Sequence, residues 1–164
     1  MSATAIPVRL LGHADGATLV ELTLDEADFG LDTDLPPAPP TLAAAQHYLS
    51  NPAVLHWVAA HPAHPAPDAS ASTVIGHLYC VRIPLRDGLG EELLLYEIGV
   101  REAWRRRGVG QLLLAHMQQW MDAHGVADVW VCADSPAAVQ FYRACGFEID
   151  PDQPTYLIHT RNQM

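Results

Sequence analysis

The sequence contains no lysine, so all nine of its basic residues are arginines. Nineteen acidic residues outnumber them and give a formal net charge of −10 at pH 7. Most of the acids lie in the first 100 residues, whereas most of the arginines follow residue 100. A negative field repels nucleic acid and attracts cationic ligands. We therefore expect a cationic small-molecule partner and no nucleic acid, although ordinary solubility explains any single acid equally well.

Long hydrophobic runs and paired cysteines are also missing. No apolar stretch approaches the length that spans a bilayer, and the first residues lack the features of a secretory signal. We therefore expect a cytoplasmic protein with no membrane partner. Cys80, Cys132 and Cys145 lie among apolar or small residues without a Cys-x-x-Cys pair, which predicts buried, reduced thiols. His61 and His64 alone are a weak metal motif, and no metal is expected.

Residue patterns predict a single domain over residues 1–164, with a mixed α/β fold. Alternating and β-branched residues mark strands, and three- to four-residue periodicity with capping residues marks helices. The predicted strands cover 6–12, 53–61, 72–85, 91–100, 126–134 and 149–160, and the predicted helices cover 15–29, 41–51, 109–125 and 136–145. The order predicts antiparallel hairpins first and a crossover connection later.

A loop rich in arginine and glycine joins the predicted strand 91–100 to the predicted helix 109–125. It runs Arg105, Arg106, Arg107, Gly108, Val109, Gly110. Backbone N–H groups at a helix start lack partners, and glycines let them approach an anion closely. The spacing matches neither a P-loop nor a dinucleotide fingerprint. The loop favours a phosphate-bearing cofactor, and on its own a solvated helix start explains it equally well.

A second motif follows the predicted strand 126–134. Ser135 is a favourable helix N-cap, Pro136 suits the first helical position, and Gly146 suits the C-terminal end. Together with Ala138, Tyr142 and Phe147, these residues follow the glycine loop in a fixed order. The two motifs resemble the GNAT family of N-acetyltransferases, whose pyrophosphate loop reads Arg/Gln-x-x-Gly-x-Gly/Ala and whose next motif reads Asn-x-x-Ala-x-x-x-Tyr-x-x-x-Gly-Phe. Only the Asn is replaced, by Ser135.

The resemblance implies the GNAT fold, a mixed central sheet with flanking helices and two parallel strands that splay apart. It also implies acetyl-CoA as the cofactor, with its pantetheine arm entering between those strands. By position, Arg105–Gly110 and Ser135 would bind the cofactor, and the backbone of Ile98, Gly99 and Val100 would pair with pantetheine. Tyr142 would also contact the cofactor and give a proton to the thiolate; the alternative is an aromatic residue that packs on the sheet.

Glu97 is the predicted base for the acceptor amine. In a regular strand it shares a face with Leu93, Leu95 and Gly99, so partial desolvation would raise its pKa. It could instead bind the substrate ammonium, or be an exposed strand residue or the partner of an arginine. Glu91 and Glu92 lie nearer the turn and are weaker candidates.

Within the family, the chain is most similar to aminoglycoside 3-N-acetyltransferases. The likeness covers RLLGHAD, DEADFG, LPPAPPT and HYLSNP, and Tyr96–Val100 stands where those enzymes have Tyr-Asp-Leu-Ala-Val. The resemblance implies transfer of an acetyl group to a primary amine of a small cationic substrate, with acids at the rim of the site. Those acids would be Asp25, Glu26, Asp28, Asp32 and Asp34. The alternatives are acetylation of a protein or peptide amine, and a catalytically silent acetyl-CoA-binding module. A homodimer is common among relatives.

Overall fold

The computed structural model describes residues 5–30, 36, 38–61 and 73–161. They fall into two compact units, residues 1–132 and residues 133–164, which are described separately. The expectation of a single domain stays a prediction. No helix in the described ranges is both long and apolar enough to cross a membrane.

The first unit is built on a five-stranded sheet with the order β1-β2-β3-β4-β5. Its strands are β1 (Val8–Leu10), β2 (Val54–Ala60), β3 (Val74–Pro84), β4 (Glu91–Val100) and β5 (Val129–Val131). Neighbours from β1 to β4 are antiparallel, whereas β4 and β5 are parallel and joined through α3 (Val109–His124). The predicted hairpins followed by a crossover are therefore confirmed.

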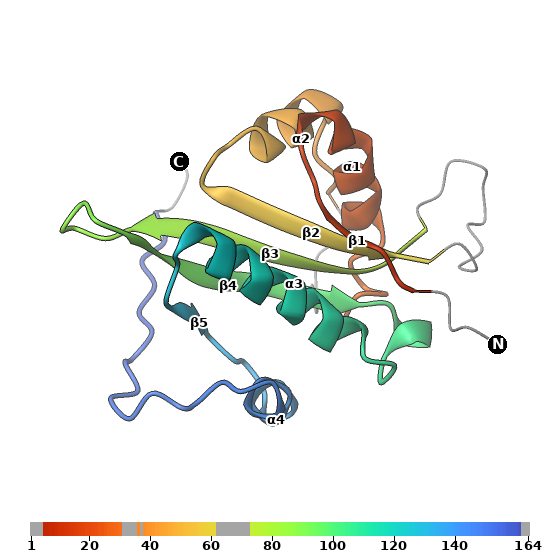
Figure 1. Cartoon of the computed structure of the whole chain (residues 1–164). Helices are drawn as coiled ribbons and strands as arrows, with labels where there is room; N and C mark the ends of the chain where they lie inside the picture. The colour runs from red at the N-terminus through yellow and green to blue at the C-terminus, as the bar shows by residue number, and fades with distance from the viewer. Residues whose placement is uncertain (1–4, 31–35, 37, 62–72, 162–164) are drawn as a thin grey trace. The chain divides into compact units, whose positions relative to one another are not determined.

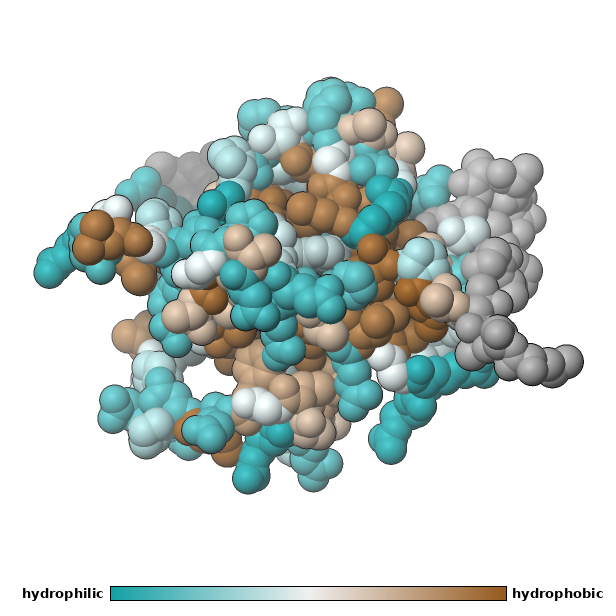
Figure 2. All heavy atoms as spheres, viewed as in Figure 1, coloured by the Kyte–Doolittle hydropathy of each residue, from teal (hydrophilic) through white to brown (hydrophobic). Residues whose placement is uncertain are grey.

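Helix α3 covers one face of the sheet (Figure 1). Its buried residues recur at helical spacing and lie against the strands, and they are Val109, Leu113, Leu114, Met117 and Met121. Gly125 ends the helix in the left-handed conformation, with a φ of 68°. The outward side of α3 is polar, and hydrophilic residues cover the middle of the face seen in Figure 2.

Helices α1 (Gly16–Leu24) and α2 (Leu42–Leu49) lie on the opposite face of the sheet (Figure 1). A short 3-10 turn, η1 (His13–Asp15), precedes α1. A hydrophobic cluster fills the space beneath the two helices, and it consists of Leu11, Leu22, Phe29, Leu49, Val58 and Val74, with Leu19 and Tyr48 packed against it. Helix α1 is shorter than the predicted 15–29. Beyond Leu24 the backbone continues to Gly30 through turns with hydrogen bonds between residues three apart, and within these turns Asp25 and Asp28 accept hydrogen bonds from Arg101.

Strand β4 contains a bulge at Tyr96. Tyr79 of β3 pairs with Glu97, but the next residue, Cys80, pairs with Leu95. One extra residue in β4 reverses the alternation of its side chains. Leu95 therefore faces α3 together with Cys80, whose sulfur lies 3.6 Å from that of Met117. Glu97 faces the α1–α2 side instead, so the prediction that it shares a face with Leu93 and Leu95 was wrong.

The second unit contains one described helix, α4 (Pro136–Ala144), which begins after Ser135 as predicted. The predicted strand over 149–160 was wrong. Residues 153–160 have no strand partner, and Tyr156, Leu157 and Ile158 are 81%, 85% and 79% exposed. An apolar run forms a strand only where an edge is available to pair with it.

Two further sequence expectations need correction. Strand β5 is three residues long rather than the predicted 126–134, since its pairing with β4 is confined to Leu93–Leu95. All three cysteines are free thiols, but only Cys80 is buried, whereas Cys145 is half-buried and Cys132 is exposed. Small neighbours in the sequence therefore did not imply burial.

Gly76 of β3 lies close to the first turns of α3. A Cβ atom there would lie 2.8 Å from Val109 Cγ1 and 3.2 Å from Leu113 Cδ1. We expect Gly76→Ala to lower the free energy of unfolding by about 1–3 kcal/mol, because the helix must move away from the sheet. Urea unfolding measures the change. Gly12→Ala is the matched control, since a Cβ at Gly12 meets nothing within 4 Å; equal losses in both variants would contradict the packing argument.

Candidate active site

The loop before α3 leaves the start of that helix open. A 3-10 turn, η2 (Glu102–Trp104), is followed by Arg105, Arg106 and Arg107, and Gly108 is the N-cap of α3. Gly108 has a φ of 81° and no side chain to cap the helix. By contrast, Thr41 and Ser135 cap α2 and α4 with their hydroxyl oxygens. The first-turn amides of α3, which include those of Val109 and Gly110, therefore lie at an N-terminus where an anion is stabilised.

The three arginines of the loop have different surroundings. Arg105 donates to the carbonyl oxygens of Val100 at 3.0 Å and Asp28 at 2.9 Å, so its guanidinium fastens the loop to β4. Arg107 lies over the ring of Trp104 at 5.2 Å. Arg106 has a φ of 62°, a left-handed conformation that is uncommon outside glycine. That these side chains bind phosphate stays a prediction.

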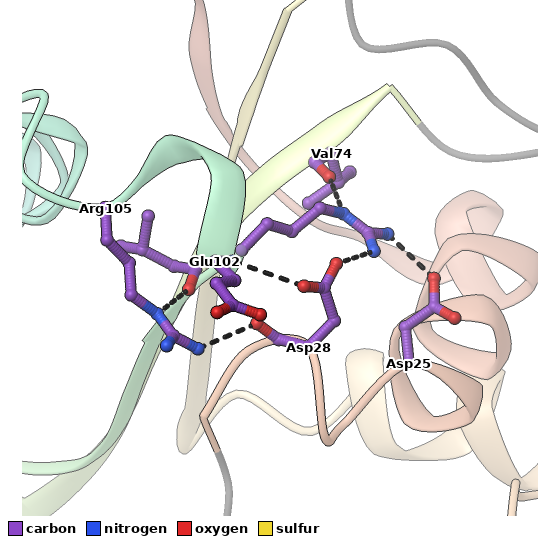
Figure 3. Close-up of polar contacts among 7 residues, drawn as sticks. Asp25, Asp28, Val74, Glu102 and Arg105 are labelled. Carbon is purple, nitrogen blue, oxygen red and sulfur yellow. Dashed lines mark hydrogen bonds and ion pairs between the residues drawn. The ribbon is translucent and has the colours of Figure 1, made fainter.

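Arg101 joins the loop after α1 to the end of β4. Figure 3 shows its three partners, Asp25, Asp28 and Val74, around one guanidinium group. Its buried guanidinium donates to Asp28 Oδ2 and Asp25 Oδ2, each at 2.8 Å, and to the carbonyl oxygen of Val74. Asp28 Oδ1 accepts from the backbone N–H of Glu102 at 3.2 Å. Asp25 and Asp28 have a structural role, since both neutralise a buried arginine. That they are also charges at the rim of a substrate site stays a prediction. Asp32 and Asp34 lie outside the described residues.

The outer edge of β4 is paired over only part of its length. Strand β5 reaches Leu93–Leu95, and β4 then continues to Val100 with no strand beside that edge in the described structure (Figure 1). The predicted divergence of the two parallel strands is therefore present. Ile98, Gly99 and Val100 lie on this free stretch, and on the other edge they pair with β3. Their backbone groups are the predicted partners of a pantetheine arm.

Glu97 lies on the same stretch, on the face toward α1 and α2. Its side chain is 32% exposed, and burial raises the pKa of its carboxyl, with a further increase from the negative charge of Glu26. Among the described residues, the basic group within ion-pairing distance is His77 Nε2, 3.6 Å from Glu97 Oε1. The alternative of an arginine partner for Glu97 therefore does not hold. Glu91 does have one, since it accepts two hydrogen bonds from Arg82.

Two buried histidines near Glu97 were not found by sequence reasoning. His56 and His77 are 5% and 3% exposed, and His77 lies across the backbone of Gly99. A Cβ atom at Gly99 would come within 2.9 Å of His77 Nε2 and of Phe29 Cβ. The available signal was a histidine in the middle of each of two apolar strands. Which face each would occupy depended on strand register.

The second unit holds the predicted residues Ser135 and Tyr142. Ser135 Oγ accepts from the N–H of Ala138 at 3.2 Å, which confirms its role as the cap of α4. Tyr142 is 7% exposed, and its ring centroid lies 5.3 Å from that of Phe147. Its role as a proton donor stays a prediction.

The histidine pair considered as a weak metal motif lies in the first unit. His61 lies beside Trp104, with 4.6 Å between ring centroids, and His64 lies outside the described residues.

A model of the Acetyltransferase (GNAT) family matches residues 23–147, which include β4, the glycine loop and α4. The chain belongs to this family. The resemblance seen in the two motifs is therefore confirmed, and so is the expected mixed α/β fold.

Solved GNAT structures share the fold at low sequence identity. An aminoglycoside acetyltransferase from an uncultured soil metagenomic sample, solved with sisomicin, has a TM-score of 0.71 and 20% identity over 97% of this chain and 96% of its own. The ribosomal-protein-alanine N-acetyltransferase of Brucella melitensis biovar Abortus has a TM-score of 0.69 and 15% identity, covering 95% and 100% of the two chains. Identities this low show the fold alone.

A closer sequence match covers a shorter stretch. Over 59 residues the chain is 36% identical to the ribosomal protein bS18-alanine N-acetyltransferase of Salmonella typhimurium. The match covers 35% of this chain and 40% of that protein, so it spans less than half of the relative's length.

The Arg101 cluster predicts a pH-dependent stability. Burial by itself would raise the pKa of Asp28, but hydrogen bonds from Arg101 and the Glu102 amide outweigh it and lower that pKa below 3.8. A lowered folded-state pKa stabilises the protein above the unfolded value, and the stabilisation is lost as the pH falls through the folded value. We expect Asp28→Asn to lower the free energy of unfolding at pH 7 by about 1 kcal/mol. The loss is modest because the Asp28 carboxylate is partly exposed.

Urea titrations at pH 7, 5 and 3 measure this difference. It should persist from pH 7 to 5 and shrink at pH 3, which lies below the ordinary pKa of an unfolded aspartate, because the unfolded chain then binds a proton that the folded carboxylate resists. Asp152→Asn, in an exposed turn, is the control and should show no difference. An Asp28→Asn loss of the same size at pH 3 and pH 7 would mean that charge is not its cause.

Proposed function

We propose that this GNAT protein transfers the acetyl group of acetyl-CoA to a primary amine of a small cationic molecule, with aminoglycosides as the first class to test. The observation that carries the proposal is the position of Glu97. Its half-buried carboxylate is close enough to Glu26 for that negative charge to raise its pKa, and it lies on the stretch of β4 beyond the pairing with β5. Two carboxylates at this point favour a positively charged acceptor.

The residues around the loop fit acetyl-CoA, which members of the family generally use. The start of α3 has no side-chain cap, and the Gly108 conformation leaves its first amides available to a diphosphate. In the proposal, the amides of residues 106–110 hold the pyrophosphate and the backbone of Ile98–Val100 holds the pantetheine arm. When bound, acetyl-CoA supplies a thioester whose acetyl group is passed to an amine.

Glu97 prepares the acceptor in this proposal. An ammonium has no free electron pair, so it must lose a proton before the nitrogen can attack a carbonyl carbon. A carboxylate with a raised pKa takes that proton more effectively at neutral pH. A backbone N–H of β4 aimed at the carbonyl oxygen stabilises the developing negative charge without reorganisation. The part given to Tyr142, protonation of the leaving thiolate, rests on its motif.

A protein amine is the second candidate acceptor. The 36% identity over 59 residues to a ribosomal-protein-alanine acetyltransferase favours it, whereas the acidic first part of the chain favours a cationic small molecule. Family membership favours either enzyme over a silent cofactor-binding module. Thiol release with a panel of aminoglycosides and polyamines, compared with peptides that carry a free N-terminal alanine, distinguishes the two acceptors.

Gln111→Glu tests the proposed cofactor site with an isosteric change. Gln111 is exposed in the first turn of α3, and its Oε1 atom lies 3.9 Å from where a Gly108 Cβ would be. A carboxylate there suits the helix dipole, so the unliganded protein should melt no lower than wild type. It repels a diphosphate, so we expect acetyl-CoA affinity to fall about tenfold at low salt and less at high salt.

Titration calorimetry at two salt concentrations and thermal shift with acetyl-CoA measure these effects. Gln118→Glu, exposed on the same helix two turns later, is the matched control. Equal affinity of wild type and Gln111→Glu would contradict a diphosphate at the start of α3.

Glu97→Gln tests the base. The amide has the same shape but cannot accept a proton at neutral pH, so we expect turnover to fall about 10²- to 10⁴-fold. Acetyl-CoA binding should be unchanged. Steady-state thiol release and titration calorimetry measure the two quantities, with Glu102→Gln as the control for an exposed carboxylate. Wild-type turnover in Glu97→Gln would exclude the assignment of the base.

A further inference from the structure

Four polar side chains form a row behind the β4 site. They are Tyr48 of α2, His56 of β2, His77 of β3 and Glu97 of β4. Tyr48 Oη lies 3.3 Å from His56 Nδ1, and His56 Nε2 lies 3.3 Å from His77 Nδ1. His77 Nε2 lies 3.6 Å from Glu97 Oε1. Catalytic contacts are often this long before the substrate binds and shorten in the complex.

The two histidines are neutral at pH 7. Burial lowers the pKa of His56 to about 3, with a contribution from His77, and lowers the pKa of His77 to about 4, with a contribution from Arg101. A neutral imidazole has one N–H donor and one acceptor nitrogen. Each histidine therefore gives a hydrogen bond on one side and receives one on the other.

The ionised carboxylate of Glu97 fixes the direction of the whole row. A carboxylate only accepts, so a hydrogen bond from His77 to Glu97 requires the proton on Nε2, and it leaves Nδ1 as an acceptor. His56 must then donate from Nε2 to that atom, which leaves its own Nδ1 to accept from the Tyr48 hydroxyl. All three donors point toward Glu97. One tautomer of each histidine satisfies every group in this buried cluster, and a wrong tautomer would leave one unpaired.

We propose that His77 is a positioning residue for the reaction: its Nε2–H holds the Glu97 carboxylate in place, and His56 and Tyr48 hold His77 in the tautomer that can do so. The inference rests on the proposed function, in which Glu97 is the base. It assigns a purpose to Gly99, because a side chain there would displace His77 from the row. It also explains why two buried histidines occupy facing strands on the side of the sheet where the bulge turns Glu97.

The test depends on the groups that face Glu97. These are Glu26, Tyr48, His77 and Tyr79, and Arg101 acts on His77 in turn. Among them, His77 is the donor at the carboxylate itself. A hydrogen bond to an ionised carboxylate lowers its pKa, so removing this donor raises the pKa of Glu97. The rising limb of the pH–rate profile then moves to higher pH.

His77→Leu and His77→Gln are compared with wild type in thiol-release assays from pH 5 to 9. We expect His77→Leu to lower turnover at pH 7 at least tenfold and to move the rising limb upward by about one pH unit. Gln can place an amide N–H near the position of Nε2, so His77→Gln should recover part of both losses. In a Glu97→Gln background, His77→Leu should have no further effect on turnover.

Tyr48→Phe keeps the test decisive if His77→Leu does not fold. It removes one hydroxyl and allows the histidines to adopt the opposite tautomers. The rising limb of the pH–rate profile should therefore move to higher pH, by less than in His77→Leu. Tyr156→Phe removes the hydroxyl of an 81% exposed tyrosine that is not part of the row, and it should leave the rising limb of the pH–rate profile in place.

The outcomes separate the two proposals. Full turnover in Glu97→Gln would overturn the assignment of the base. Loss of turnover in Glu97→Gln, together with unmoved pH limbs in the folded His77 and Tyr48 variants, would overturn the positioning role alone.

Discussion

The bulge at Tyr96 is the constraint on which the geometry of the site depends. One additional residue in β4 keeps Leu93 and Leu95 in the core beneath α3 and turns Glu97 and Gly99 to the opposite face. The strand can therefore serve a hydrophobic core at one end and a polar site at the other. Without the extra residue, a charged side chain would lie against Met117 and its neighbours, where an unpaired carboxylate is costly.

Glycines set how closely the elements around this strand can approach. Gly76 lets α3 lie against the sheet, and Gly99 lets His77 cross the backbone beside Glu97. Gly108 begins α3 in a left-handed conformation with no side chain over the first-turn amides. Glycines therefore allow close packing at both proposed binding positions, the diphosphate at the start of α3 and the amine at Glu97.

Charge serves structure in one part of the molecule and chemistry in another. Asp25 and Asp28 neutralise the buried Arg101 and hold the loop after α1 against the end of β4. Arg105 makes a second connection between the same loop and strand through backbone carbonyls. Glu26 lies between the two aspartates in sequence, and its negative charge raises the pKa of Glu97. Within this acidic stretch, Asp25 and Asp28 therefore have a structural role, whereas Glu26 influences the proposed base.

The sequence by itself determined the elements and the family. Hydrophobic spacing, Ser135 and Thr41 as caps, and the glycine loop are local signals, so β4, α3 and α4 were found close to their observed bounds. The strand at 149–160 and the shared face of Glu97 with Leu95 were wrong, because pairing and a bulge depend on a neighbouring strand. Only the tertiary structure brought Tyr48, His56 and His77 into a row behind Glu97, and Asp25 and Asp28 to Arg101. Contacts between residues 21 to 76 positions apart follow from register and packing, which no local pattern encodes.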